Sequence, residues 1–144
     1  MSGFVLDTDT LSLYQRGHPA VCRRCGGPPA GGLFITIITV EEQLSGWYSL
    51  LRRAKGRSDL ARIYGNLAET IGFLAPLPIL SFTEPAIDRF HELVALRLNV
   101  GMMDLRIAAI VLEHSGTLVT RNARDFRRIP GLVIQDWTSE NGAP

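Results

Sequence analysis

Short runs of β-branched and aromatic residues alternate along this chain with longer segments in which apolar residues recur at helical spacing. The short runs cover residues 4–6, 33–38, 79–81, 117–120 and 132–134. Strands that alternate with helices predict a mostly parallel sheet flanked by helices on both faces. No long linker interrupts this alternation, and 144 residues suit one globular unit. We therefore predict a single α/β domain over residues 1–144.

The middle of the chain is predicted to form a helical hairpin inserted into this alternation. Thr39 stands three residues before Glu42, which is the spacing of a capping box, and apolar residues then recur at helical intervals up to Leu51. A turn over residues 55–58 precedes a second helical pattern over residues 60–74.

Three other helices are expected. One lies near Leu11, one runs from Thr83 to about Leu98, and one begins near Met103 and stops at Gly116. Residues 22–32 are expected to be loop-prone because glycine and proline dominate their second half, and residues 138–144 are expected to form a tail.

Four acidic residues stand close to the predicted strand ends and helix starts. Asp7 ends the first strand, Glu42 follows the second, Asp104 opens a late helix and Asp125 follows the strand at 117–120. Ligands of open α/β sheets bind at the carboxyl ends of the strands, so these acids are predicted to converge. Gathered carboxylates repel unless cations neutralise them, and oxygen ligands suit Mg²⁺ or Mn²⁺. The pattern favours metal-dependent phosphodiester hydrolysis.

Each acid also has a purely structural interpretation. Asp7 or Asp9 could cap the first helix, and Glu42 and Asp104 could favour the amino ends of theirs. Asp125 could be a solvated loop residue. Composition and spacing alone leave both interpretations open.

The sequence segments around these acids resemble the motifs of VapC-type PIN-domain ribonucleases. The similar blocks are FVLDTDTLS at 4–12, ITVEEQLSG at 38–46, GMMDLRIAA at 101–109, and LVTRNARDF at 118–126 followed by IPGL at 129–132. They stand in the family's order over nearly the whole chain. The resemblance implies a PIN fold and transfers the catalytic and metal-binding roles to Asp7, Glu42 and Asp104.

The fourth block departs from the commonest pattern. Many relatives have an acid where this chain has Asn122, and others have it three residues later, where Asp125 stands. We assign the fourth site position to Asp125 and keep Asn122 as the alternative, because an amide oxygen can hold a water molecule or a metal. Thr120, Thr8 and Asp9 are further candidates beside the site.

Two basic clusters give the only local signal for nucleic acid in a chain of formal net charge +1. The cluster beside the fourth acid is expected to contact RNA phosphates. It consists of Arg121, Arg124, Arg127 and Arg128. The second cluster, at the hairpin turn, fits a solvated surface and an RNA contact equally well, and it consists of Arg52, Arg53, Lys55 and Arg57.

The resemblance further implies a type II toxin that cleaves structured RNA such as tRNA, forms a homodimer and is repressed by a VapB-like antitoxin. An antitoxin peptide would lie across the active-site groove, and Trp47, Tyr48 and Leu51 are expected either in the core or at the edge of that groove. Two other functions remain open: a DNA-directed nuclease of related fold, and a non-catalytic regulatory binding module.

The remaining features argue for a cytoplasmic protein without a membrane span. The apolar stretch at 33–40 is much shorter than the roughly 20 residues that a transmembrane helix needs. The first residues lack the pattern of a signal peptide. Cys22 and Cys25 are too few for a disulfide scaffold, and one such pair lacks the second pair that a closed zinc site requires.

Overall fold

The computed structural model describes residues 3–27 and 31–139, and within them one parallel sheet organises the chain. Its strands are β1 (Phe4–Leu6), β2 (Leu33–Thr36), β3 (Ile79–Leu80), β4 (Thr117–Val119) and β5 (Val133–Gln135). The spatial order is β3-β2-β1-β4-β5, and every neighbouring pair is parallel. The predicted α/β class and parallel sheet are confirmed.

The central strands are mostly apolar because helices cover both faces of the sheet. Side chains alternate along β1, so Val5 packs into one apolar cluster and Leu6 into another. The side chains of the paired strand β4 alternate in the same way, with Leu118 in the first cluster and Val119 in the second. All four side chains are completely buried. The two clusters fix the register of the strands and hence the position of their carboxyl ends.

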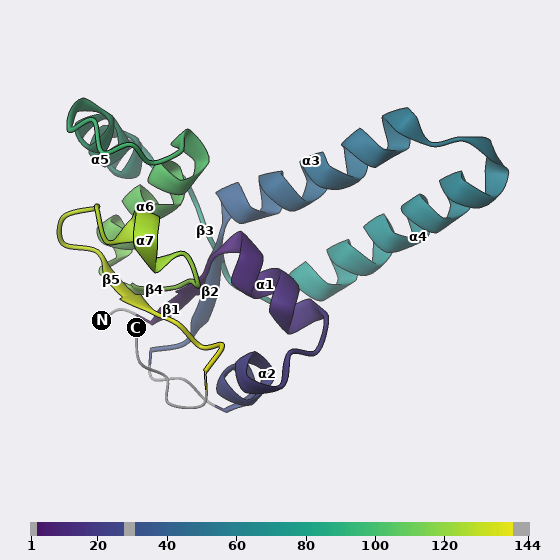
Figure 1. Cartoon of the computed structure of the whole chain (residues 1–144), viewed down its shortest axis with the longest axis horizontal. Coiled ribbons are helices and arrows are strands. Elements are labelled where there is room, and N and C mark those ends of the chain that lie inside the picture. The colour runs from purple at the N-terminus through teal and green to yellow at the C-terminus, as the bar shows by residue number, and fades with distance from the viewer. Residues whose placement is uncertain (1–2, 28–30, 140–144) are drawn as a thin grey trace.

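Seven helices connect the strands within the described residues, and two of them form the predicted hairpin. They are α1 (Thr8–Gln15), α2 (Pro19–Gly26), α3 (Ile37–Arg53), α4 (Gly56–Leu74), α5 (Glu84–Ala95), α6 (Met102–His114) and α7 (Ala123–Phe126). Helices α3 and α4 pack antiparallel and extend away from the sheet, whereas α5 packs along α6 on the other side (Figure 1). None of the helices in the described residues is long and apolar enough to cross a membrane.

The second strand is shorter than predicted, and the proposed capping box is wrong. Strand β2 ends at Thr36, whose hydroxyl accepts a hydrogen bond from the backbone N–H of Thr39 and thereby caps α3. Ile37 and Ile38 consequently belong to the helix. Glu42 therefore lies in the second turn of α3, where it is free of any capping role.

Two helix boundaries also differ from the prediction. Helix α4 begins at Gly56, not at residue 60, because the positive φ of 83° at this glycine reverses the chain within a shorter turn. Helix α5 ends at Ala95 and not near residue 98, since Arg97 and Asn99 adopt left-handed conformations that end a helix.

Two predicted loops contain helices. Residues 22–26 belong to α2, which is capped by His18 through its Nδ1 atom and has Pro19 in its first turn. Asp125 lies in α7, capped by the side chain of Asn122, and is not in a loop. The prediction for residues 28–30 and for 140–144 of the tail falls outside the described residues.

Candidate active site

A cleft of about 390 Å³ opens where β1 and β4 end and where α1, α3 and α6 approach one another. Its lining consists of Asp7, Thr8, Asp9, Ser12, Glu42, Asp104, Asn122 and Phe126. The fold thus brings three of the four predicted acids into one cleft, at the edge of the sheet where α/β proteins bind ligands.

Asp7 combines the structural and the functional interpretation. It follows β1 as the N-cap of α1, and its Oδ1 accepts a hydrogen bond of 2.8 Å from the backbone N–H of Thr10. The side chain is only 6% exposed. Burial raises the pKa of Asp7, and hydrogen bonds from Thr120 and Thr10 oppose this rise without cancelling it. A buried carboxylate of this kind favours a cation beside it.

Asp104 lies in the first turn of α6, and its pKa responds both to burial and to the other three predicted acids. Burial raises its pKa from an ordinary 3.8 to about 6, and the negative charges of Glu42, Asp7 and Asp125 add to the rise. The other three predicted acids are therefore close enough to Asp104 to repel its negative charge. This repulsion favours the binding of a cation in the cleft.

Glu42 is held in place by Thr8, whose hydroxyl in turn contacts that of Thr39. The Thr8 hydroxyl donates a hydrogen bond of 2.6 Å to Oε1 of Glu42, and the hydroxyls of Thr8 and Thr39 lie 3.1 Å apart. Because Thr8 begins α1 while Thr39 and Glu42 belong to α3, these bonds fix the carboxylate relative to both helices.

Asp125 and Asn122 divide the role predicted for the fourth acid. Asn122 lines the cleft, while Asp125 is absent from its lining and instead accepts hydrogen bonds from Asn122 Nδ2 at 3.0 Å and from Arg128 at 3.4 Å. The backbone N–H of Asn122 bonds the buried hydroxyl of Thr120 at 2.9 Å. Asp125 therefore acts on the cleft through its charge and through the orientation of Asn122.

The arginines beside the cleft are of two kinds. Arg121 forms an ion pair of 2.9 Å with Asp9, and Arg128 bonds Asp125 and the backbone oxygen of Asn99. Arg124 and Arg127 are exposed on and just after α7.

The donor set of the cleft fits a hard divalent cation. Asp7, Glu42 and Asp104 offer carboxylate oxygens and Asn122 an amide oxygen, which are the ligands that Mg²⁺ and Mn²⁺ prefer. Over residues 3–27 and 31–139, however, no three Asp, Glu, His or Cys side chains are already arranged to hold one metal ion. Reorientation of carboxylates such as Glu42 would accompany binding.

The two cysteines lie away from this chemistry. Cys22 and Cys25 are both free thiols on α2, and Cys22 Sγ lies 3.7 Å from the backbone oxygen of Tyr14. Burial, and to a lesser degree Cys22, raises the pKa of Cys25 to about 12, so its thiol stays protonated.

Sequence reasoning missed two polar residues of the site. Ser12 lines the cleft, and Thr39 supports Glu42 through Thr8. The signal for Ser12 was its position four residues after Thr8, which places both side chains on one helical face. Thr39 was misread as a helix cap.

A parallel sheet in this order, with an acid-lined cleft at its carboxyl edge, defines a nuclease domain of the PIN type. No protein-family model matches the chain. It is 30% identical over 141 residues to the tRNA(fMet)-specific endonuclease VapC of Salmonella typhimurium, with 95% of this chain and 99% of the relative covered. The chain therefore belongs to the VapC family of ribonucleases.

Solved structures agree with this assignment. A DNA-bound VapBC complex from Salmonella typhimurium contains a chain 28% identical to this one, with a TM-score of 0.70 over 95% of this chain and 99% of the other. VapBC2 from Rickettsia felis, bound to a promoter DNA fragment, shares the fold with a TM-score of 0.73 at 23% identity, over 94% and 98% of the two chains.

Proposed function

We propose that this chain is the toxin of a type II toxin–antitoxin pair and that it hydrolyses structured RNA with Mg²⁺ or Mn²⁺. The convergence of Asp7, Glu42 and Asp104 on one cleft carries the proposal, because three acids from distant parts of the sequence line the ligand-binding edge of the sheet. Membership of the VapC family supports the choice of RNA over DNA.

The side chains of the cleft have separate tasks in this proposal. Asp7, Glu42 and Asp104 would hold the cation, with Asp125 and Asn122 completing the site. A bound divalent cation would lower the pKa of a water molecule and polarise the phosphodiester. Thr8 keeps Glu42 directed by its hydrogen bond. Arg124 and Arg127, which are exposed, would contact RNA phosphates next to the cleft.

The substrate is proposed to be a structured RNA of the tRNA class. The Salmonella relative is named as a tRNA(fMet)-specific endonuclease, and this name supports the class without fixing the individual tRNA here.

A cleavage panel tests the activity. Purified chain would be incubated with labelled tRNA and with single-stranded DNA, in Mg²⁺ and in excess chelator. We expect metal-dependent cleavage of tRNA by the natural chain and by the control Asp88→Asn, which changes an exposed acid of α5. Asp104→Asn should lose about 10²-fold or more. Cleavage of DNA alone would indicate a DNA nuclease, and no cleavage of either would indicate a binding module.

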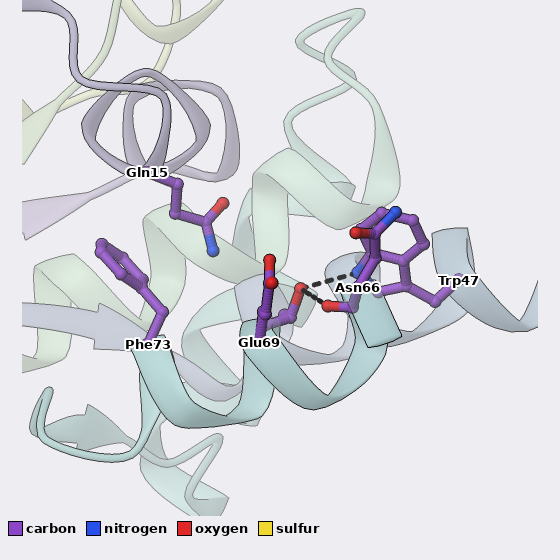
Figure 2. Close-up of a pocket in the computed structure, with 6 residues that line it drawn as sticks. Gln15, Trp47, Asn66, Glu69 and Phe73 are labelled. Carbon is purple, nitrogen blue, oxygen red and sulfur yellow. Dashed lines mark hydrogen bonds between the residues drawn. The ribbon is translucent and has the colours of Figure 1, made fainter. Parts of the chain in front are cut away.

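A groove beside the cleft supports the proposed antitoxin partner. A hollow of about 330 Å³ shares Thr8, Ser12 and Glu42 with the cleft. It also shares Trp47 with a further hollow of about 320 Å³ between α1, α3 and α4, shown in Figure 2. A peptide laid along this groove would bring an arginine within reach of the carboxylates.

The sequence left open whether Trp47 and Tyr48 lie in the core or at the edge of this groove. Trp47 is half-buried, and its indole N–H donates a hydrogen bond of 2.9 Å to the Thr70 hydroxyl (Figure 2). Tyr48 is 47% exposed. Trp47 therefore belongs to the groove wall and Tyr48 to the outer surface, so neither fills the core.

We further propose that the chain forms a homodimer. Large apolar side chains such as Leu96 and Met102 are more than half exposed, which is the kind of surface that a second copy covers. Light scattering at micromolar concentration tests this proposal, and a mass of one chain would contradict it.

A further inference from the structure

The far end of the helical hairpin carries a concentration of positive charge. The hairpin tip, defined as residues 52–57, joins α3 to α4 and is the part of the hairpin most distant from the sheet (Figure 1). It contains Arg52, Arg53, Lys55 and Arg57, all exposed, and no acidic residue. The whole chain has a formal net charge of only +1, so the rest of it carries a net negative charge.

The charges of the tip are largely free to meet a partner. The nearby acid Asp59 is engaged by Arg62 at 2.6 Å and by the backbone N–H of Lys55. Among the described residues, neither Arg52 nor Arg57 has an acidic side chain within ion-pair distance. A cluster of this kind without local counter-charges attracts a polyanion.

An exposed aromatic ring adjoins the cluster on α3. Tyr48 lies four residues before Arg52, so the two side chains share one face of the helix. Nearly half of Tyr48 is exposed. Aromatic rings and guanidinium groups are the side chains on which unpaired RNA bases stack, so Tyr48 and Arg52 together could hold such a base.

The distance between the tip and the cleft suits a long substrate. Arg53 follows Glu42 by eleven positions in one helix, which corresponds to about 16.5 Å at about 1.5 Å per residue. Successive phosphates of one strand of a DNA duplex advance by about 3.4 Å along its axis, and on that scale this distance spans roughly five nucleotides. A small ligand bound in the cleft would not reach the tip, but a structured RNA would.

We propose that the hairpin tip is a second contact surface for the RNA substrate, holding phosphates about five nucleotides from the bond that is cut. The inference rests on the proposed ribonuclease function and extends it to how the substrate is positioned. The tip would act on binding and register, while the carboxylates of the cleft act on the bond.

The test compares two double variants, each of which lacks two arginine charges. The tip variant Arg52→Gln/Arg57→Gln and the control Arg16→Gln/Arg97→Gln each remove two exposed arginines, the control pair lying at the ends of α1 and α5. Binding of a fluorescent RNA hairpin with 20 base pairs would be measured by anisotropy between 50 and 300 mM salt, with chelator present so that no cleavage occurs. Thermal melting would confirm that both variants fold.

We expect the tip variant to bind about tenfold more weakly than the natural chain at 0.1 M salt. Its slope of log K against log salt should be shallower by about two, since each lost phosphate contact removes about 0.9. The control should change neither quantity by more than a small fraction of this, and Arg52→Lys/Arg57→Lys should restore most of the binding. Equal behaviour of tip and control variants would overturn the proposal.

A failure of the tip proposal can be told apart from a failure of the proposed ribonuclease function. If the chain cleaves tRNA but the tip and control variants bind the RNA hairpin equally, only the tip proposal fails. If no RNA is cleaved, the binding comparison still decides whether the tip contacts RNA. Loss of antitoxin binding or of self-association in the tip variant, with RNA binding equal to the control, would identify the tip as a protein contact and overturn the proposal.

Discussion

The hydroxyl of Thr8 donates a hydrogen bond of 2.6 Å to Oε1 of Glu42 and thereby joins the start of α1 to α3 at the mouth of the cleft. The same hydroxyl lies 3.1 Å from that of Thr39. A carboxylate surrounded by other acids tends to turn away from them toward water. The two threonines offset this tendency, so they determine where one of the proposed metal ligands points.

Removing the Thr8 hydroxyl should weaken metal binding. Thr8→Val keeps the shape of the side chain and eliminates its hydrogen bond to Glu42, and lost support of a ligand of this kind typically lowers metal affinity by 10- to 100-fold. Thr8→Ser, which keeps a hydroxyl, is the matched control. Calorimetric titration with Mn²⁺ measures the effect, and equal affinity of Thr8→Val and the natural chain would show that the bond does not position the ligand.

The raised pKa of Asp104 predicts a stability that falls with rising pH in the metal-free protein. Its pKa is about 6 in the folded chain and near 3.8 in the unfolded chain. Between these values the folded state holds more protons than the unfolded state, so the free energy of unfolding decreases as pH rises from about 4 to about 6. Above about pH 6 the carboxylate is ionised, and it lowers the free energy of unfolding by an amount that no longer changes with pH.

The variant Asp104→Asn isolates this effect because it cannot titrate. Chemical denaturation of both proteins without metal should show the natural chain losing stability relative to Asp104→Asn from pH 4 to pH 6. Added Mg²⁺ should stabilise the natural chain more at pH 7.5 than at pH 5, since ionised ligands bind it better. A difference in stability that does not change with pH would contradict the assignment.

Asp125 should matter less than Asp104 for catalysis. Its carboxylate is bound by Asn122 and Arg128 and lies outside the lining of the cleft. Asp125→Asn should therefore lower kcat/KM for tRNA by about 10-fold, compared with about 10²-fold or more for Asp104→Asn. Equal losses in the two variants would mean that Asp125 rotates into the cleft and binds the metal directly.

Filling the groove should separate antitoxin binding from catalysis. Gly46 lies on α3 in the groove wall, and a Cβ atom added there would meet no atom within 4 Å. Gly46→Tyr should place a ring in the groove without disturbing the helix, so a cognate antitoxin should bind at least 10-fold more weakly, as expected for an interface residue of this size. Surface plasmon resonance measures the affinity, and the matched control is Gly65→Tyr, at an exposed position of α4 that does not line the groove and where an added Cβ atom also meets no atom within 4 Å.

The order of the strands and of helices α1, α3, α4, α5 and α6 could be predicted because the strands are short runs of β-branched and aromatic residues and these helices have apolar residues at helical spacing. Helices α2 and α7 were not predicted. The end of the second strand was predicted wrongly because a single polar side chain sets it. Thr36 ends β2 by capping α3, and nothing in the surrounding isoleucines distinguishes that point from a longer strand.

The acids of the cleft were predictable for a different reason. Periodicity placed Asp7 and Asp104 near the edge where a parallel sheet binds its ligands, but it left a helix-capping role equally open, and the resemblance to the VapC motifs decided for a site. The division between Asn122 and Asp125 was not predictable, because it depends on α7, a helix of four residues that is too short to leave a periodic pattern.

The chemical form of the cleaved ends is the sharpest test of the mechanism. A ribonuclease that uses the neighbouring 2′-hydroxyl as nucleophile needs a general base at that hydroxyl and an acid at the leaving oxygen, and it gives 2′,3′-cyclic phosphates. No histidine is among the residues lining this cleft in the described part of the chain, and burial together with the neighbouring acids raises the pKa of Asp104, which favours a bound cation. We therefore expect a water molecule to attack phosphorus while the bond to the 3′-oxygen breaks, which leaves 5′-phosphate and 3′-hydroxyl ends. Ligation-based sequencing of the fragments, with and without prior phosphatase treatment, identifies these ends, and Asp7→Asn serves as the inactive comparison. Cyclic phosphates, or cleavage that persists in excess chelator, would rule out the proposed hydrolysis while leaving the fold and the family unchanged.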